Sequence, residues 1–144
     1  MNRKLSSHHV EAADRFHSAA IHALRHVRRE DPATGLSAAR LSALSVIVFG
    51  GPIRISALAR AEQVKTPTMT PIVAALERDG LVIREADSSD ARAALLRATA
   101  KGARLMAEGR ARRVALLAQE LRRLPAAERR LLNEAVRLLE SLGR

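Results

Sequence analysis

Hydrophobic positions recur at helical spacing along most of the chain. Over residues 7–29 apolar side chains return every three or four positions, with polar residues on the other side. The pair Asp31-Pro32 predicts the end of this first helix. A second helix is expected from an N-cap at Ser37 to Phe49, before the turn Gly50-Gly51-Pro52. A third, short helix spans about residues 55–62.

The next helix follows after only three residues, Gln63-Val64-Lys65. Thr66 can cap it and Pro67 can take its first position, where a missing N–H costs nothing. Pro71 lies close to this start, so we expect a local distortion and not a break. Gly80 ends the helix. Two helices joined by so short a turn predict a helix-turn-helix, whose second helix enters the DNA major groove by its N-terminal end.

The pattern beyond Gly80 changes to that of extended structure. Residues 81–84 are rich in β-branched side chains, residues 87–90 have the composition of a turn, and residues 93–98 return to strand-forming character with Leu95, Leu96 and Arg97. A two-stranded hairpin is marginal alone and must pack against helices. We therefore predict a mainly α fold with a small β-hairpin wing attached to the helix-turn-helix.

Amphipathic helices flank this central unit on both sides. Thr99 can cap a long helix with an apolar stripe, Pro125 interrupts the pattern, and a last helix reaches the end of the chain. The small central unit offers these helices no partner, so we predict a homodimer built from both termini. We expect a single domain over residues 1–144, with dimerisation helices at about 1–34 and 100–144 and the DNA-binding region at about 36–99.

The charge balance supports a polyanionic partner. The formal net charge is +10, and Lys4, Lys65 and Lys101 are the only lysines, so arginine carries the excess. Nucleic acid is the first partner to consider and an anionic membrane surface the second. An arginine-rich genome would explain part of the same excess. With no cysteine, no secretory leader and no apolar run of membrane length, we expect a cytoplasmic protein without disulfides, membrane spans or cofactors.

Candidate DNA contacts gather in the second helix of the helix-turn-helix and in the wing. The helix start combines a cation with small hydroxyl side chains that can reach phosphates and base edges. The wing carries arginines suited to a phosphate backbone or a narrow minor groove. The candidate set is Lys65, Thr66, Thr68, Met69, Thr70, Arg84, Asp90, Arg92 and Arg97.

The order and spacing of several short motifs are similar to those of the MarR family of transcription regulators. These motifs are Leu36-Ser37, Ile55-Ser56-Ala57-Leu58-Ala59, Thr66-Pro67-Thr68-Met69-Thr70, Leu76-Glu77-Arg78-Asp79-Gly80-Leu81-Val82, Asp90-Ala91-Arg92, and Leu96-Arg97-Ala98-Thr99-Ala100-Lys101-Gly102. The resemblance implies an obligate homodimer that binds a pseudo-palindromic operator, usually as a repressor, and often releases it when a small ligand binds. It also implies that Asp90 holds Arg92, which reaches into the minor groove.

The chain departs from the pattern of that family at three positions. Arg54 stands where a small capping residue is common, Ala91 replaces a frequent arginine, and Pro71 replaces a frequent polar or basic residue. The first two changes are compatible with the fold. The third removes a long donor from the recognition helix, so we expect base recognition to depend on the threonines and on DNA shape.

Other functions compete with this hypothesis. A non-specific nucleoid-type DNA-binding protein would share the charge and the helices, but would show a steep salt dependence with little sequence preference. An enzyme would need a catalytic constellation, and neither a Ser-His-Asp-like set nor a glycine-rich phosphate loop is present. His22 and His26 have metal-ligand spacing without cysteines or clustered acids nearby, so solvent-exposed or interface histidines are the default.

The sequence does not identify an effector. The chain has no Trp or Tyr, and Phe16 and Phe49 are its only aromatic residues of the Phe, Tyr and Trp class. An aliphatic pocket lined by the first, second and fifth helices, with an arginine for an anionic group, is one arrangement that would serve a small-molecule effector.

Overall fold

The computed structural model describes residues 6–87 and 90–142 and is mainly helical, with one small antiparallel sheet. This agrees with the predicted fold class. In chain order the elements are α1 (Ser7–Val27), the 3-10 helix η1 (Arg28–Thr34), α2 (Ala38–Gly50), β1 (Ile53–Arg54), α3 (Ile55–Ala61), α4 (Thr66–Arg78), β2 (Val82–Asp87), β3 (Asp90–Ala98), α5 (Ala100–Arg122) and α6 (Ala126–Leu142).

Two predicted helix caps are confirmed and one is wrong. The hydroxyl of Ser37 accepts from the Arg40 N–H, and that of Thr99 accepts from the Gly102 N–H at 3.1 Å. Thr66, in contrast, is already the first residue of α4, because the Lys65 carbonyl accepts from two N–H groups of the first turn. Lys65 therefore occupies the N-cap position of α4, without a capping side-chain bond.

The first α-helix ends before Asp31-Pro32, as predicted, but the chain stays helical beyond its end. The α-helix stops at Val27, and the chain continues through Asp31 and Pro32 as the 3-10 helix η1. A short 3-10 segment has few i→i+3 bonds to lose, so it accommodates a proline. Gly35, with φ of 72°, ends the segment, and the Thr34 hydroxyl bonds to the Asp31 carbonyl at 2.7 Å.

The wing sheet has one strand more than predicted. The order of strands is β1-β3-β2, all antiparallel, and β1 pairs Ile53 with Leu96 and Arg54 with Leu95. Two residues are too few to show strand alternation, and β1 exists because β3 offers it an edge. The predicted β2–β3 hairpin is confirmed, with Val82 opposite Ala98.

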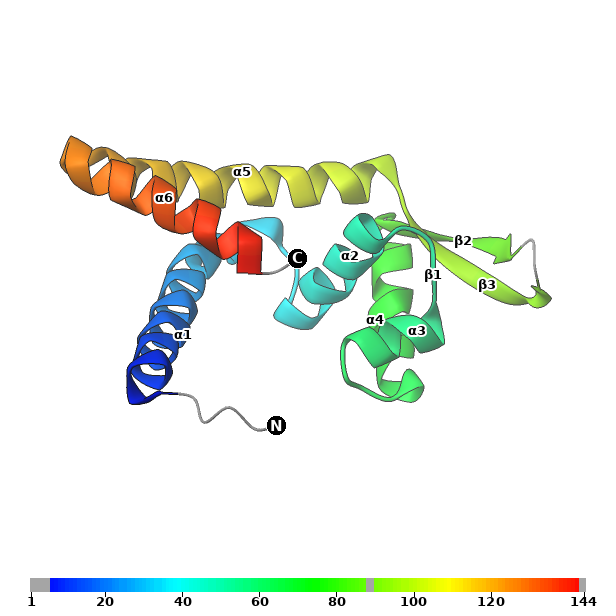
Figure 1. Ribbon diagram of the computed structural model, residues 1–144. Coiled ribbons are helices and arrows are strands. Elements are labelled where there is room, and N and C mark those ends of the chain that lie inside the picture. Colours follow the sequence, from blue (N-terminus) through cyan, green and yellow to red (C-terminus); the bar gives the residue numbers. More distant parts are fainter. Residues whose placement is uncertain (1–5, 88–89, 143–144) are drawn as a thin grey trace.

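The hydrophobic core lies within the helix-turn-helix and wing unit. Side chains from α2, α3 and α4 meet the inner face of the sheet and the start of α5, and Leu44, Leu58, Val73 and Leu76 are fully buried. Along the strands Val82 and Leu96 point inward. Figure 1 shows α5 running from this unit to the opposite end of the molecule, where α1 and α6 lie.

The flanking helices keep apolar side chains at the surface. Exposed large hydrophobic residues lie along all three of them: Val10, Phe16, Ile21 and Leu24 in α1, Val114, Leu117 and Leu121 in α5, and Leu131, Leu132, Val136, Leu138 and Leu139 in α6. Among the described helices, none is long and apolar enough to cross a membrane. The apolar stripes therefore remain uncovered in a single protomer.

Candidate nucleic-acid interface

The turn between α3 and α4 positions the recognition helix. Gln63 takes a left-handed conformation with φ of 56°, and the Val64 N–H bonds back to the Ala59 carbonyl at 2.9 Å. On the inner side of α4, Met69, Val73 and Leu76 are at most 1% exposed. The recognition helix is thus anchored to the core by one side, and the N-terminal half of its other side faces solvent.

Four of the predicted contacts on this helix are accessible. Lys65, Thr66, Thr68 and Thr70 are all exposed. The Thr70 hydroxyl donates to the Thr66 carbonyl at 3.0 Å, which leaves its oxygen as an acceptor. Met69 is a correction: its side chain is 1% exposed and packs in the core, so it is not available to DNA in this conformation. Helical spacing places position 69 on the same side as Val73.

The wing arginines are held by carboxylates. Arg84 donates from Nε to Glu77 at 2.8 Å, which ties β2 to the last turn of α4. Arg97 donates from Nε to Glu85 at 2.7 Å, diagonally across the hairpin. Both arginine side chains remain more than 40% exposed. Their charge is partly compensated, so a phosphate would have to compete with these partners or join them.

The other predicted pair in the wing is Asp90 with Arg92. The backbone places both residues in β3, but their side chains lie outside the described part of the structure. The expected interaction between them therefore stays a prediction.

An ion pair that the sequence did not predict ties the wing to the helix-turn-helix. Arg54, the residue that precedes α3, donates from Nε and Nη2 to Oδ2 of Asp87 at the end of β2. Asp87 is only 8% exposed and, among the residues whose side chains the structure describes, is the one buried charged residue. The unusual arginine at position 54 was the available signal, but its partner lies 33 positions away.

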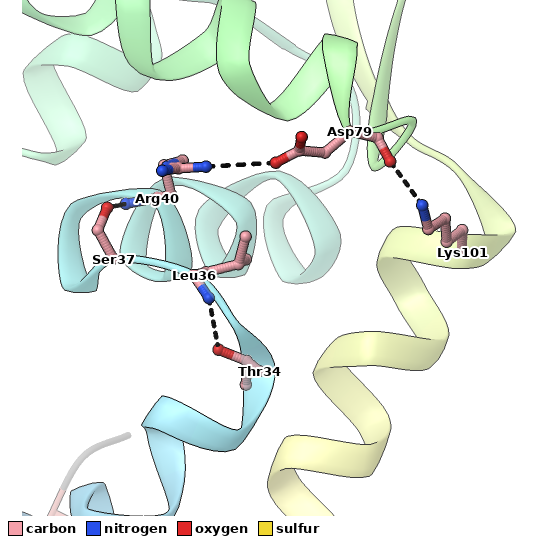
Figure 2. Close-up of polar contacts among 6 residues, drawn as sticks. All are labelled: Thr34, Leu36, Ser37, Arg40, Asp79 and Lys101. Atoms are coloured by element: carbon pink, nitrogen blue, oxygen red, sulfur yellow. Dashed lines mark hydrogen bonds and ion pairs between the residues drawn. The ribbon is translucent and has the colours of Figure 1, made fainter.

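The C-terminal end of α4 is held from two sides (Figure 2). Nη1 of Arg40, in α2, lies 3.3 Å from Oδ2 of Asp79, the residue that follows α4. Nζ of Lys101, near the start of α5, donates to the Asp79 carbonyl at 2.7 Å. The end of the recognition helix is thus linked by polar contacts to both α2 and α5.

Metal ligation gains no support from the geometry. Among the described residues no group of three His, Cys, Asp or Glu side chains could hold a metal ion. His22 is exposed and His26 half-buried on α1.

These features define a winged helix-turn-helix protein, a class that binds DNA: the second helix is exposed on a buried core, and the antiparallel hairpin that follows is tied to it.

Comparison with known proteins identifies the family within this class. The MarR family model matches residues 36–94, from just before α2 into the wing. An HTH-type transcriptional regulator of Mycobacterium bovis is 34% identical over 118 residues, which is 82% of each chain. The chain belongs to the MarR family and is a transcription regulator with a DNA-binding helix-turn-helix.

Solved structures agree with the fold. A transcriptional regulator from Thermotoga maritima superposes with a TM-score of 0.83 at 23% identity, covering 92% of this chain and 93% of that one. A variant of MepR from Staphylococcus aureus, solved bound to an oligodeoxyribonucleotide, superposes with a TM-score of 0.70 at 17% identity, covering 91% and 97%. At these identities the similarity concerns the fold alone.

Proposed function

We propose that the protein is a homodimeric, ligand-responsive repressor that binds a pseudo-palindromic DNA operator. In this proposal the N-terminal end of α4 enters the major groove of each half-site, and the wing lies over the adjoining minor groove. The observation that carries it is the exposed start of α4 beside a wing, both mounted on one buried core. With Arg92 in the minor groove and the two half-sites about one helical turn apart, the protein would cover both halves of the operator.

The surface of the protomer supports the dimer. Its accessible area is 10931 Å², whereas a compact monomer of 15.6 kDa exposes about 7,200 Å². The excess includes the uncovered apolar stripes on α1, α5 and α6, and large contiguous apolar surfaces mark interaction sites. In the described protomer α6 has no extensive packing against another element. A second copy would bury these stripes in an interface of the obligate kind.

A cavity at the junction of the two regions supports the ligand response. It measures about 420 Å³, within the range of small-molecule sites, and is lined by residues of η1, α2 and α5. Among the described residues, Arg28 and Arg113 line it together with one carboxylate, that of Asp31, so the described charged lining has a net positive sign. Leu41, Phe49 and Met106 supply apolar contacts. An amphipathic anion fits this lining.

A bound ligand would change the position of the recognition helix through α2 and α5. These two helices line the cavity and also carry Arg40 and Lys101, which hold Asp79 at the end of α4. A ligand that changes the spacing of α2 and α5 would therefore shift α4 relative to its partner in the dimer. Small shifts suffice, because both recognition helices must fit their half-sites together.

Footprinting on the DNA that flanks the protein's own coding region tests the DNA-binding part. We expect a protected segment with two-fold symmetry and half-site centres ~10 bp apart. Titrations at several salt concentrations against this segment and a shuffled duplex supply the control. Equal affinity for both duplexes, with a steep salt slope, would support the nucleoid-type alternative that the charge of +10 keeps open and would refute the operator.

A further inference from the structure

The outward ridge of the recognition helix is apolar. Met69, Val73 and Leu76 define the buried side of α4. At 100° per residue the opposite side carries Pro67, Pro71, Ala74 and Arg78, and all four are exposed. Two pyrrolidine rings and a methyl group therefore occupy the part of the helix farthest from the core. The first charged side chain on this ridge comes only in the last turn.

The threonines of α4 lie beside this ridge. Thr66 and Thr70 lie on one side of it and Thr68 on the other, and all three are exposed. Each carries a methyl group next to its hydroxyl. The Thr70 hydroxyl is used as a donor within the helix, to the Thr66 carbonyl. The reading surface is thus rich in methyl and methylene groups and poor in free donors.

Long polar side chains are missing from the middle of the helix. Bidentate recognition of guanine needs Arg or Lys, and that of adenine needs Asn or Gln. Residues 66–77 contain none of these four types, and Glu77 is engaged by Arg84. The cations Lys65 and Arg78 lie at the two ends, about 20 Å apart along the axis. Since the major groove is about 12 Å wide, they suit the phosphates at its rims and not the bases at its floor.

We propose that α4 reads thymine by apolar contact with its C5-methyl group. This inference rests on the proposed operator binding and names the feature of DNA that the operator presents. Thymine is the base that carries a methyl group in the major groove, and alanine and threonine methyls are its usual protein contacts. Pro67, Pro71, Ala74 and the threonines form a matching surface. The half-sites therefore contain thymines at the positions under the first turns of α4.

Replacing thymine by deoxyuridine in the protected segment tests the proposal, because this change removes only the methyl group. We expect a loss of affinity of about four-fold for each thymine in contact, from burial of one methyl group, at equivalent positions of both half-sites. The salt slope should not change. As a control, deoxyuridine between the half-sites should leave the affinity unaltered.

Two substitutions at Thr68 locate the contact on the protein. Thr68→Ser removes the methyl and keeps the hydroxyl, while Thr68→Val keeps the methyl and removes the hydroxyl. We expect Thr68→Ser, and not Thr68→Val, to lose affinity and to become insensitive to deoxyuridine at one position. Circular dichroism and thermal unfolding check that both variants are folded. If a Thr68 variant does not fold, Pro71→Ser makes the same test on the ridge itself.

The outcomes separate the two proposals. A protected, symmetric segment whose affinity is unchanged by deoxyuridine at every position under α4 would overturn methyl reading and leave the operator proposal intact. The absence of any preferred sequence would overturn the operator proposal, and the methyl reading with it.

Discussion

The guanidinium group of Arg54 donates from Nε at 2.9 Å and from Nη2 at 2.5 Å to one carboxylate oxygen of Asp87. This pair joins the residue before α3 to the last residue of β2, and so connects the first helix of the helix-turn-helix to the outer part of the wing. Asp87 is 8% exposed, whereas the Arg54 side chain is 43% exposed. The carboxylate therefore depends more on the pair than the arginine does.

Arg54→Ala is expected to destabilise the protein by about 1 kcal/mol, because a buried carboxylate loses a charge-assisted partner. A double-mutant cycle with Asp87→Ala, measured by chemical denaturation, should give a coupling energy of about 1 kcal/mol. Arg60→Ala, at an exposed arginine in α3, serves as the control and should change stability much less. A coupling energy near zero would show that the pair does not hold the wing.

Gly102→Ala is expected to destabilise the protein by about 2 kcal/mol. A Cβ at position 102 would collide with the backbone carbonyl of Leu81, and would also come within 3.3 Å of Leu44 Cδ1. The start of α5 therefore needs glycine in order to approach the end of the helix-turn-helix closely.

Gly109→Ala, on the same helix, is the matched control for position 102. Its nearest neighbour would be Thr34 Cγ2 at 3.7 Å, an ordinary contact, and alanine is the better helix former by about 1 kcal/mol. Thermal unfolding should thus move in opposite directions for the two variants. The same sign for both would contradict the close approach of α5 to Leu81.

Leu117→Glu is expected to shift the protein towards monomers. Leu117 lies on the exposed apolar stripe of α5, and a carboxylate there would be desolvated in the proposed interface. Sedimentation velocity over a range of concentrations measures the shift. Gln119→Glu adds the same charge at another exposed position of α5 and should leave the distribution close to that of the wild type. An unchanged dimer in Leu117→Glu would place the interface elsewhere.

Arg92→Ala is expected to weaken operator binding and to reduce the salt slope by about 1, as the loss of a phosphate or minor-groove contact would do. Electrophoretic mobility shifts at several salt concentrations provide the measurement. Arg137→Ala removes the same charge from the exposed surface of α6 and controls for net charge. Unchanged operator affinity in Arg92→Ala would refute the role of the wing.

Benzoate is expected to stabilise the protein against thermal unfolding more than its neutral analogue benzamide does. The cavity combines Arg28 and Arg113 with the aromatic ring of Phe49, so the carboxylate carries the difference between the two probes. Arg113 also pairs with Asp31 at 3.5 Å, so Arg113→Ala should remove the preference while the fold is checked by circular dichroism. Equal effects of benzoate and benzamide on the wild type would count against an anion site.

Local sequence patterns were sufficient to predict most of the helices and strands. Helices are recognised by the spacing of their apolar residues and by N-cap residues. The hydroxyls of Ser37 and Thr99 make the predicted capping hydrogen bonds. The errors occurred where the local pattern was short or ambiguous. Thr66 and Pro67 both favour a helix start, and the choice between caps depended on which carbonyl received the first N–H groups. Strand β1, with two residues, has no periodicity to read.

The candidate site was partly predictable, because part of it follows from local sequence patterns. Lys65, Thr66, Thr68 and Thr70 lie at the exposed start of α4, as their place after a short turn indicated. Met69 belongs to the same motif, but the direction of its side chain follows from the rotation of α4 against the core. Motif membership and exposure are separate properties, and only the second depends on packing.

The amino-acid sequence by itself determined the class of this protein: a helix-turn-helix, a hairpin and flanking amphipathic helices, each encoded by contacts within a few residues. The tertiary structure decided which side chains are available and which are engaged. It joined Arg54 to Asp87, and Asp79 to both Arg40 and Lys101. It also turned Pro67, Pro71 and Ala74 outward. These relationships depend on long-range packing, since the rotation of a helix about its axis is set by the core that it helps to form.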